Sequence, residues 1–244
     1  MKINFKIKNK EKEIKLLVSE KVFKPTQTTK LLLEQSTKKI KKKKLKILDM
    51  GCGSGVIGIY ILKKYKNINL ITFSDISKES TNLTRKNLIA NKINKKKFEV
   101  IKSDTFENLN GKKFDIIIND VSGISSEVSK LSEWFKNVPC DTGKNGTELT
   151  EKIIRNYNNF LNNKGILLLP IISLSKEKRI FDLIKKLKLQ HNLLSLTRWP
   201  LPQNMYKKID KLRSLKKLKL INYEEKYNLL IANTKIIQIK KKLN

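Results

Sequence analysis

Residues that could hold a nucleoside cofactor are concentrated in one segment, LKILDMGCGSGVIGIYILKKYKNINLITFSD, which spans residues 45–75. An apolar, strand-like stretch ends at Asp49, and three alternate glycines follow from Gly51 to Gly55. Glycine lets the backbone approach a ligand closely, and free N–H groups at the start of a helix favour a negative or polar group. Asp75 follows about 20 residues later, where a carboxylate can bind the two hydroxyls of a ribose. The spacing therefore predicts a nucleoside-cofactor site.

Two classes of cofactor fit these glycines. Gly53, Gly55 and Gly58 match G-x-G-x-x-G, the fingerprint of nicotinamide and flavin enzymes, which is a weak signal when it stands alone. The run begins earlier, however, at Gly51, and Asp49 stands at the strand tip, where a carboxylate would repel a pyrophosphate and attract an ammonium group. The pattern D-x-G-x-G therefore resembles class I S-adenosylmethionine-dependent methyltransferases. A nicotinamide or flavin enzyme, or a non-catalytic relative, is the alternative.

Composition restricts the remaining possibilities. The chain has 244 residues, of which 39% are hydrophobic, enough for one sizeable core in a soluble α/β protein. Two cysteines cannot build a disulfide framework or a metal cluster, and the single histidine, His191, excludes a multi-histidine site, so no metal is expected. No apolar run approaches the roughly 20 residues of a membrane span, and the N-terminus has no apolar signal core. We expect no membrane partner and a location in the cytoplasm or an organelle matrix.

The net charge of +32 has two interpretations. A basic surface would attract RNA, ribosomes or another polyanion. Alternatively, the charge reflects AT-rich coding, because lysine, isoleucine and asparagine are frequent throughout, whereas arginine, the better phosphate reader, is scarce. The second interpretation is favoured, and both predict non-specific polyanion binding.

Strand-like and helix-like segments alternate along the chain, which predicts a doubly wound, seven-stranded, mostly parallel sheet. Residues 1–35 are predicted to form an N-terminal extension with two short strands (Ile3–Ile7 and Glu13–Val18), a cofactor-covering turn and the start of a helix (Lys30–Ser36), capped by Thr28 or Thr29. Residues 36–244 are predicted to form the sheet domain. Its expected strands are Leu45–Asp49, Leu70–Phe73, Phe98–Ile101, Phe114–Ile118, Gly165–Ile172, Leu193–Leu196 and Tyr227–Ala232. Its expected helices are Val56–Tyr65, Lys78–Ala90, Gly146–Leu161, Glu177–Leu187 and Met205–Leu218.

Four polar residues stand at the ends of four predicted parallel strands: Asp49, Asp75, Asp104 and Asn119. Ligands of open α/β sheets bind outside the carboxyl ends of the strands, so these residues are expected on one rim. Four polar strand ends are more specific than any single glycine motif.

The cofactor is expected to lie along this rim. Asp49 and the loop Gly51–Gly55 would hold its aminoacyl part, and Cys52 in that loop is a small residue that fits there. Asp75 would accept hydrogen bonds from the ribose hydroxyls, and Ile76 would cover one face of the adenine.

The adenine amino group is assigned to the next strand end. Asp104 would accept a hydrogen bond from it, with Thr105 or Phe106 on the other side of the ring. Both Asp75 and Asp104 have a structural alternative, since an Asp after a strand often caps the following helix.

Six short motifs follow one another in the order of a known family. They are Phe23-x-Pro25-x-x-x-Thr29-x-Leu31-Leu32, Asp49-x-Gly51-Cys-Gly53-Ser-Gly55, Asp75-Ile-Ser77, Asp104-Thr-Phe106, Phe114-Asp-Ile-Ile-Ile-Asn119 and Gly143-x-x-Gly146-x-x-Leu149. Over about residues 22–172 the chain resembles the release-factor glutamine N5-methyltransferases and the wider small-domain methyltransferases of ribosomal RNA, tRNA and protein amides. The resemblance implies S-adenosylmethionine as cofactor, with Thr29 and Asn119 among the residues around it. In lacking a helical domain before the match, the chain resembles the single-domain eukaryotic and archaeal-type members.

One motif departs from the family. There the fourth strand ends in Asn-Pro-Pro-Tyr, whose Asn and following carbonyl accept the hydrogens of a planar nitrogen while the Tyr stacks on it. Here the chain reads Asn119-Asp120-Val121-Ser122-Gly123, so the Asn is kept and the aromatic ring is missing. Asn119 and Asp120 are the candidate catalytic residues, Asp120 either as a general base or as a turn residue.

The sequence leaves several classes of methyl acceptor possible. A protein glutamine, as in a translation release factor, is the first expectation, and an rRNA or tRNA base is the second. A small molecule, or a catalytically degenerate RNA- or ribosome-binding relative, completes the set. Trp134 after the acceptor loop and Trp199 between Arg198 and Pro200 are candidate substrate-contacting rings, although such residues also pack beneath loops.

Overall fold

The computed structural model describes residues 2–5, 14–40, 44–135, 137–138 and 142–242. A two-stranded hairpin, β1 (Lys2–Phe5) and β2 (Ile14–Leu17), precedes one large sheet and its helices. The strands of the large sheet are β3 (Leu45–Met50), β4 (Ile68–Asp75), β5 (Phe98–Lys102), β6 (Phe114–Asn119), β7 (Leu161–Ile172), β8 (His191–Pro200), β9 (Glu224–Lys226) and β10 (Leu229–Lys240). The helices are α1 (Gln27–Thr37), α2 (Val56–Lys64), α3 (Lys78–Ala90), α4 (Ser126–Leu131), α5 (Glu148–Asn156), α6 (Glu177–Lys186), α7 (Gln203–Tyr206) and α8 (Ile209–Lys217), and Lys95–Lys97 and Tyr157–Phe160 form 3-10 turns.

The strand order of the large sheet is β5-β4-β3-β6-β7-β10-β8, with β9 beside β10. The five strands from β5 to β7 run parallel, and β10 is antiparallel to both of its long neighbours. The chain winds outward from β3 in one direction and then from β6 in the other, so the order reverses between β3 and β6. This confirms the predicted doubly wound, mostly parallel sheet, and the reversal marks where such sheets bind ligands. The short β9 is an eighth strand that the pattern did not predict.

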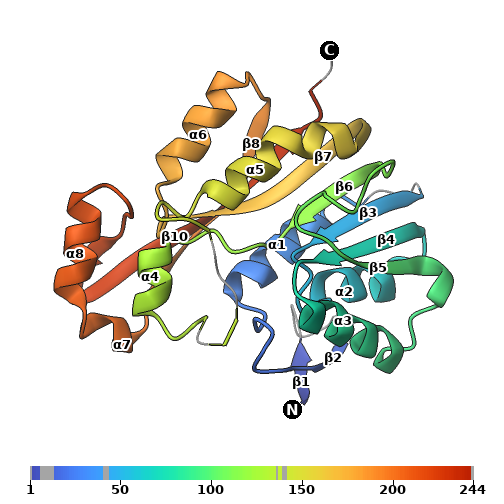
Figure 1. Ribbon diagram of the computed structural model, residues 1–244, viewed down its shortest axis with the longest axis horizontal. Helices are drawn as coiled ribbons and strands as arrows, with labels where there is room; N and C mark the ends of the chain where they lie inside the picture. Colours follow the sequence, from blue (N-terminus) through green and yellow to red (C-terminus); the bar gives the residue numbers. More distant parts are fainter. Residues whose placement is uncertain (1, 6–13, 41–43, 136, 139–141, 243–244) are drawn as a thin grey trace.

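Helices cover both faces of the sheet, with α1, α2 and α3 on one face and α5 and α6 on the other (Figure 1). The central strands β3 and β6 are buried along nearly their whole length, as their continuous apolar runs require. Each face has its own apolar core, and a third core forms where α4, α7 and α8 pack near the start of β10. None of the helices in the described ranges is long and apolar enough to cross a membrane.

Two predicted element boundaries were wrong. Helix α1 begins at Gln27 and its N-cap is Thr26, not Thr28 or Thr29, because Thr26 and Thr29 form a reciprocal capping box. The helix predicted over Gly146–Leu161 is confined to α5 and a 3-10 turn, and Leu161 already opens β7.

Two further predictions fell short in the last part of the chain. Strand β8 continues beyond Leu196 to Pro200 because it pairs with β10 over nine residue pairs. The basic helix predicted over Met205–Leu218 is divided into α7 and α8. Residues 6–13, which contain parts of both predicted N-terminal strands, lie outside the described residues.

Candidate active site

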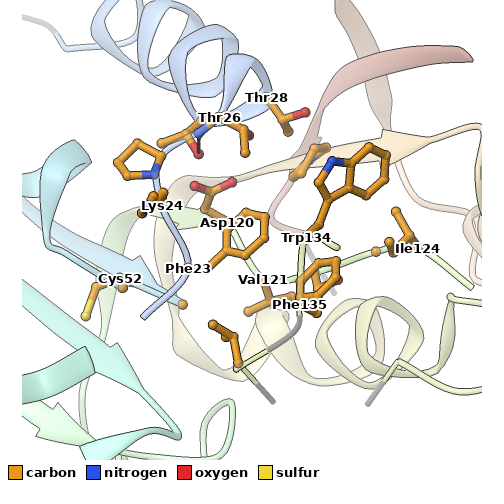
Figure 2. A pocket seen from close by; sticks show the side chains of 18 of the residues that line it. Phe23, Lys24, Thr26, Thr28, Cys52, Asp120, Val121, Ile124, Trp134 and Phe135 are labelled. Carbon is orange, nitrogen blue, oxygen red and sulfur yellow. Dashed lines mark hydrogen bonds between the residues drawn. The ribbon is translucent and has the colours of Figure 1, made fainter. Parts of the chain in front are cut away.

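A cavity of about 650 Å³ lies over the carboxyl ends of β3, β4, β5 and β6, at the reversal of the strand order. Its near half is lined by the glycine loop after β3 and by the turns after β4 and β5. Its far half is lined by aromatic and apolar residues from the segment before α1, the loop after α4 and the end of β8. Figure 2 shows Cys52 on one side, Trp134 and Ile124 on the other, and Asp120 and Phe23 between them. The cavity therefore has a polar, glycine-lined end and an aromatic end.

The glycine loop needs its glycines for two reasons. Gly51, Gly53 and Gly55 all have positive φ values, of 69°, 53° and 80°, a region that side chains disfavour. In addition, a Cβ on Gly51 would lie 2.8 Å from Cγ1 of Val121, which follows β6. Gly51, Cys52 and Gly53 line the cavity, whereas Gly55 lies outside its lining as the N-cap of α2. The loop thus lies directly against the residues that follow β6.

Asp75 braces this loop against the end of β4. Its Oδ2 accepts a hydrogen bond of 2.9 Å from the Gly53 N–H, and its Oδ1 accepts one of 2.9 Å from the Ser77 N–H. Burial raises the pKa of Asp75, and these two N–H groups counteract the shift. Asp75 is not the N-cap of α3, since Ser77 has that position. Asp75 and the exposed Ile76 both line the cavity.

Asp104 also lines the cavity, but it has a cationic partner. The Nζ of Lys152, on α5, lies 2.9 Å from Asp104 Oδ2 and 3.1 Å from Glu107 Oε1. Thr105, the next residue, is buried with a φ of 48° and belongs to the same wall. Nothing in the local sequence indicated Lys152, which is 48 residues further along the chain.

Asp49 lies behind the cavity wall rather than in it. Its Oδ2 accepts a 2.9 Å hydrogen bond from the Gly58 N–H of α2, and its Oδ1 has no partner among the described residues. Burial raises the pKa of Asp49 to about 7; the Gly58 hydrogen bond opposes the shift, and the charges of Asp120 and Asp75 add to it. Its direct contact is therefore with the first turn of α2.

The two candidate catalytic residues after β6 differ in position. Asn119 is buried outside the cavity lining, and its Oδ1 accepts a 3.2 Å hydrogen bond from the Val121 N–H. Asp120 lines the cavity, and the Thr29 hydroxyl donates to its carboxylate. Burial raises the pKa of Asp120 to about 7, against the effect of this hydrogen bond. Asp120 is thus the carboxylate that faces the space between the two halves (Figure 2).

Thr29 is part of the capping box that fixes the turn before α1, which lines the cavity. The Thr26 N–H donates to Thr29 Oγ1 at 3.2 Å, while the Thr29 N–H donates to Thr26 Oγ1 at 3.5 Å. Thr28 lies 3.4 Å from Thr234 of β10, oxygen to oxygen. The first turn of α1 therefore contacts both Asp120, after β6, and strand β10.

Aromatic rings from distant segments meet at the far end. Phe23 and Phe135 stack with ring centroids 4.7 Å apart, and Trp134 and Trp199 meet edge to face at 6.0 Å. The Trp199 indole N–H donates to Thr234 Oγ1 at 3.0 Å. The sequence singled out both tryptophans individually, but Phe135 and Thr234 carry no local motif, and only the fold brings this group together.

The near half fits a polar, nucleoside-bearing cofactor. The buried hydroxyls of Ser54 and Ser74 line it and have no hydrogen-bond partner among the described residues. Buried polar atoms are normally paired, so unpaired ones beside a cavity indicate a polar ligand. The glycine cradle and Asp75 provide the close approach and the acceptor that such a ligand needs.

Comparisons with known proteins agree with this geometry. The model of the methyltransferase small domain matches residues 16–120. The chain is 30% identical over 174 residues to a putative protein N5-glutamine methyltransferase of Methanocaldococcus jannaschii, covering 71% of this chain and 84% of that one. It is 30% identical over 165 residues to the release factor glutamine methyltransferase of Lactococcus lactis, covering 66% of this chain and 59% of that one.

Two further similarities are to methyltransferases whose names give other substrates. Over 91 residues the chain is 40% identical to the ribosomal RNA small subunit methyltransferase C of Pasteurella multocida, covering 36% of this chain and 26% of that one. The crystal structure of precorrin-6y C5,15-methyltransferase from Geobacter metallireducens superposes with a TM-score of 0.56 at 12% identity, covering 93% of this chain and 94% of that one. This last similarity concerns the fold alone.

Proposed function

The chain belongs to the small-domain methyltransferase family and is an S-adenosylmethionine-dependent methyltransferase, and we propose that its acceptor is the side-chain amide of a glutamine in a protein. The observation that carries the proposal is the position of Asp120, a carboxylate between the glycine-lined half and the aromatic half of one cavity. The similarity to the Methanocaldococcus protein, which extends over 84% of its length, supports an amide acceptor.

We propose the following cofactor contacts. The loop around Gly51–Gly53 and the neighbouring Ser74 hold the aminoacyl end, and Asp75 accepts from the ribose while keeping the loop in position. The adenine lies between Ile76 and Thr105, with Asp104 at its amino edge. Three residues act from behind this surface: Asp49 fixes the first turn of α2, Gly55 allows the turn into that helix, and Asn119 supports the backbone of Val121.

The cofactor supplies an activated methyl group on a sulfonium. The residues of this chain must bring the acceptor nitrogen to about 3–3.5 Å from it, in line with the breaking bond. In its ionised form, Asp120 accepts a hydrogen bond from the acceptor N–H, orients the nitrogen lone pair and receives the proton that the nitrogen gives up. Phe23 and Phe135, stacked beside this point, keep water away from it.

An RNA base is the second candidate acceptor. The net charge of +32 favours it, because a strongly basic surface attracts a polyanion. The similarity to the ribosomal RNA methyltransferase of Pasteurella multocida supports it over a shorter part of the chain.

The test is transfer of a labelled methyl group from S-adenosylmethionine into an extract of the source cells, followed by protease or nuclease treatment. We expect label that survives nuclease and is lost with protease, and the reverse result would identify RNA. Asp75→Ala is the control, because it removes the hydrogen bond that Asp75 accepts from the Gly53 N–H of the glycine loop and the one that it accepts from the Ser77 N–H. Absence of transfer above this control, with S-adenosylhomocysteine shown to bind the wild-type chain, would refute the proposal.

A further inference from the structure

The far half of the cavity contains a stacking surface that the family motif does not provide. No ring follows Asn119 on β6, since Asp120, Val121 and Ser122 occupy the next positions. The rings of the cavity come from other elements, and two of them, Phe23 and Phe135, already stack on each other. A ring face that is stacked on another ring is not available to a ligand. The tryptophans are therefore the candidates for contact with an acceptor.

The two tryptophans have different surroundings. The indole N–H of Trp199 is held by Thr234, which is buried and also lies beside Thr28. In the described part of the chain, by contrast, no hydrogen bond engages the indole N–H of Trp134. Trp134 is half-buried, lines the cavity and meets Trp199 edge to face. Trp199 is thus a fixed wall, and Trp134 rests against it.

Trp134 and Asp120 together offer complementary groups to an acceptor. Both residues line the same cavity and are labelled in Figure 2, Trp134 with an aromatic surface and Asp120 with a carboxylate acceptor. A primary carboxamide is flat, donates from its nitrogen and accepts at its oxygen. A carboxylate of the same shape has no N–H to donate, and Asp120 would repel it.

We propose that Trp134 is the acceptor-binding ring of this enzyme, which stacks on a planar carboxamide while Asp120 receives the amide N–H. This inference rests on the proposed function and deepens it, because it assigns the role of the absent strand-end tyrosine to a residue on the loop after α4. Trp199 supports the Trp134 ring from behind and does not contact the acceptor.

The chain contains two tryptophans and both line the cavity, so intrinsic fluorescence reports on this site alone. The full chain with Trp199→Phe has Trp134 as its only indole. We would saturate it with S-adenosylhomocysteine and titrate it with the methylamide of N-acetylglutamine, using the methylamide of N-acetylglutamate as the probe that has a carboxylate in place of the side-chain carboxamide. The inference expects a saturable fluorescence change with the glutamine probe and none with the glutamate probe. Equal responses to both, or a response only to added cytidine and guanosine, would overturn it.

Kinetics with the acceptor identified in the extract give an independent readout. Trp134→Ala is expected to lower kcat/KM about tenfold, mainly through KM, and Trp134→Phe to restore most of it, because a ring is retained. The affinity for S-adenosylhomocysteine should stay unchanged in both variants. Tyr227→Ala, which removes a ring that is 81% exposed on the β9–β10 hairpin, is the control for truncation of an aromatic residue. If the wild type transfers methyl groups and Trp134→Ala is equally active, the inference fails alone; if the wild type transfers none, the proposed function fails as well.

Discussion

At the scale of single residues, the proposed role of Asp120 predicts that the rate of methyl transfer depends on pH. Its pKa of about 7 results mainly from burial, which disfavours the charged form, against a hydrogen bond from Thr29. Only the ionised carboxylate accepts an N–H proton, so kcat/KM is expected to rise from about pH 6 to about pH 8. Asp120→Asn should remove this rise and lower the rate by about 100-fold or more. An unchanged profile in this variant, measured by initial rates of methyl transfer, would assign the titration to another group.

Asp49 has a similarly raised pKa, but its consequence is for stability. The pKa is about 7 in the folded chain, against an ordinary value of 3.8. Between these values the folded state binds more protons than the unfolded state, so the stabilisation is complete below about pH 4 and is lost as the pH rises through 7. Asp49→Asn can still accept from the Gly58 N–H but does not titrate. Between pH 5 and pH 8, we expect the free energy of unfolding of this variant to fall less than that of the wild-type chain. The difference should be on the order of 2–4 kcal/mol. Urea unfolding of both chains without cofactor measures this, and parallel pH dependences would contradict it.

The residues of the candidate cofactor site could be predicted because each one is indicated by the short sequence motif in which it stands. Gly51 and Asp75 stand at fixed offsets from strand ends, and the structure gives both to one cavity wall. The partners of the predicted site residues could not be predicted. Asp104, for example, pairs with Lys152 only because α5 packs beside the end of β5. Likewise, nothing near Trp199 in the sequence indicates that Thr234 receives its indole N–H.

At the scale of elements, helix α2 is fitted closely against the strand beside it. A Cβ added to Gly58 would lie 2.3 Å from Cε1 of Phe73 on β4 and 3.1 Å from Oδ2 of Asp49. Replacing glycine by alanine within a helix normally stabilises it by about 1 kcal/mol. Here the overlap should dominate, and we expect Gly58→Ala to destabilise the chain by about 1–3 kcal/mol. Gly123→Ala is the matched control, because its Cβ would meet no atom closer than 3.8 Å. Equal melting temperatures for the two variants would show that α2 shifts without cost.

Some elements were visible in the sequence because their signals are local. The observed bounds of α3, Lys78–Ala90, are the predicted ones, and Ser77 caps it through a hydrogen bond to the Ser80 N–H. The end of α5 was misjudged because the apolar residues Tyr157, Phe160 and Leu161 suit a helix and a strand equally well. Pairing of Leu161 with Phe114 of β6 decides for the strand, and this contact spans 47 residues.

At the scale of the whole molecule, the alternation of elements predicted the sheet but not the aromatic end of the cavity. That end depends on β10 lying between β7 and β8, which brings Trp199 and Thr234 beside the loop after α4. A register between strands distant in sequence leaves no trace in either strand's own pattern. The strands that line the proposed cofactor site come from one half of the chain, whereas the proposed acceptor surface needs both halves.

The net charge of +32 is also a property of the whole molecule, and its origin can be tested by its distribution. Binding to a homopolymeric RNA should weaken steeply with salt, with a slope of about −0.7 per phosphate contacted in a plot of log K against log salt concentration. If the charge is compositional, any three exposed lysines contribute alike. Two triplets of exposed lysines lie at α6 and α8: Lys185, Lys186 and Lys188 at the end of α6, and Lys207, Lys217 and Lys219 on either side of and within α8.

We expect replacement of either triplet by glutamine to reduce the salt slope by the same small amount, and to leave methyl transfer to a protein acceptor unchanged. Fluorescence anisotropy of a labelled RNA at several salt concentrations measures the slopes. A selected RNA surface would give a different result, because one triplet would lie in the path of the phosphate backbone and the other would not. A loss of slope confined to the α8 triplet, beside the core that supports Trp134 and Trp199, would therefore argue that the charge directs RNA to the cavity and would favour the base over the amide as acceptor.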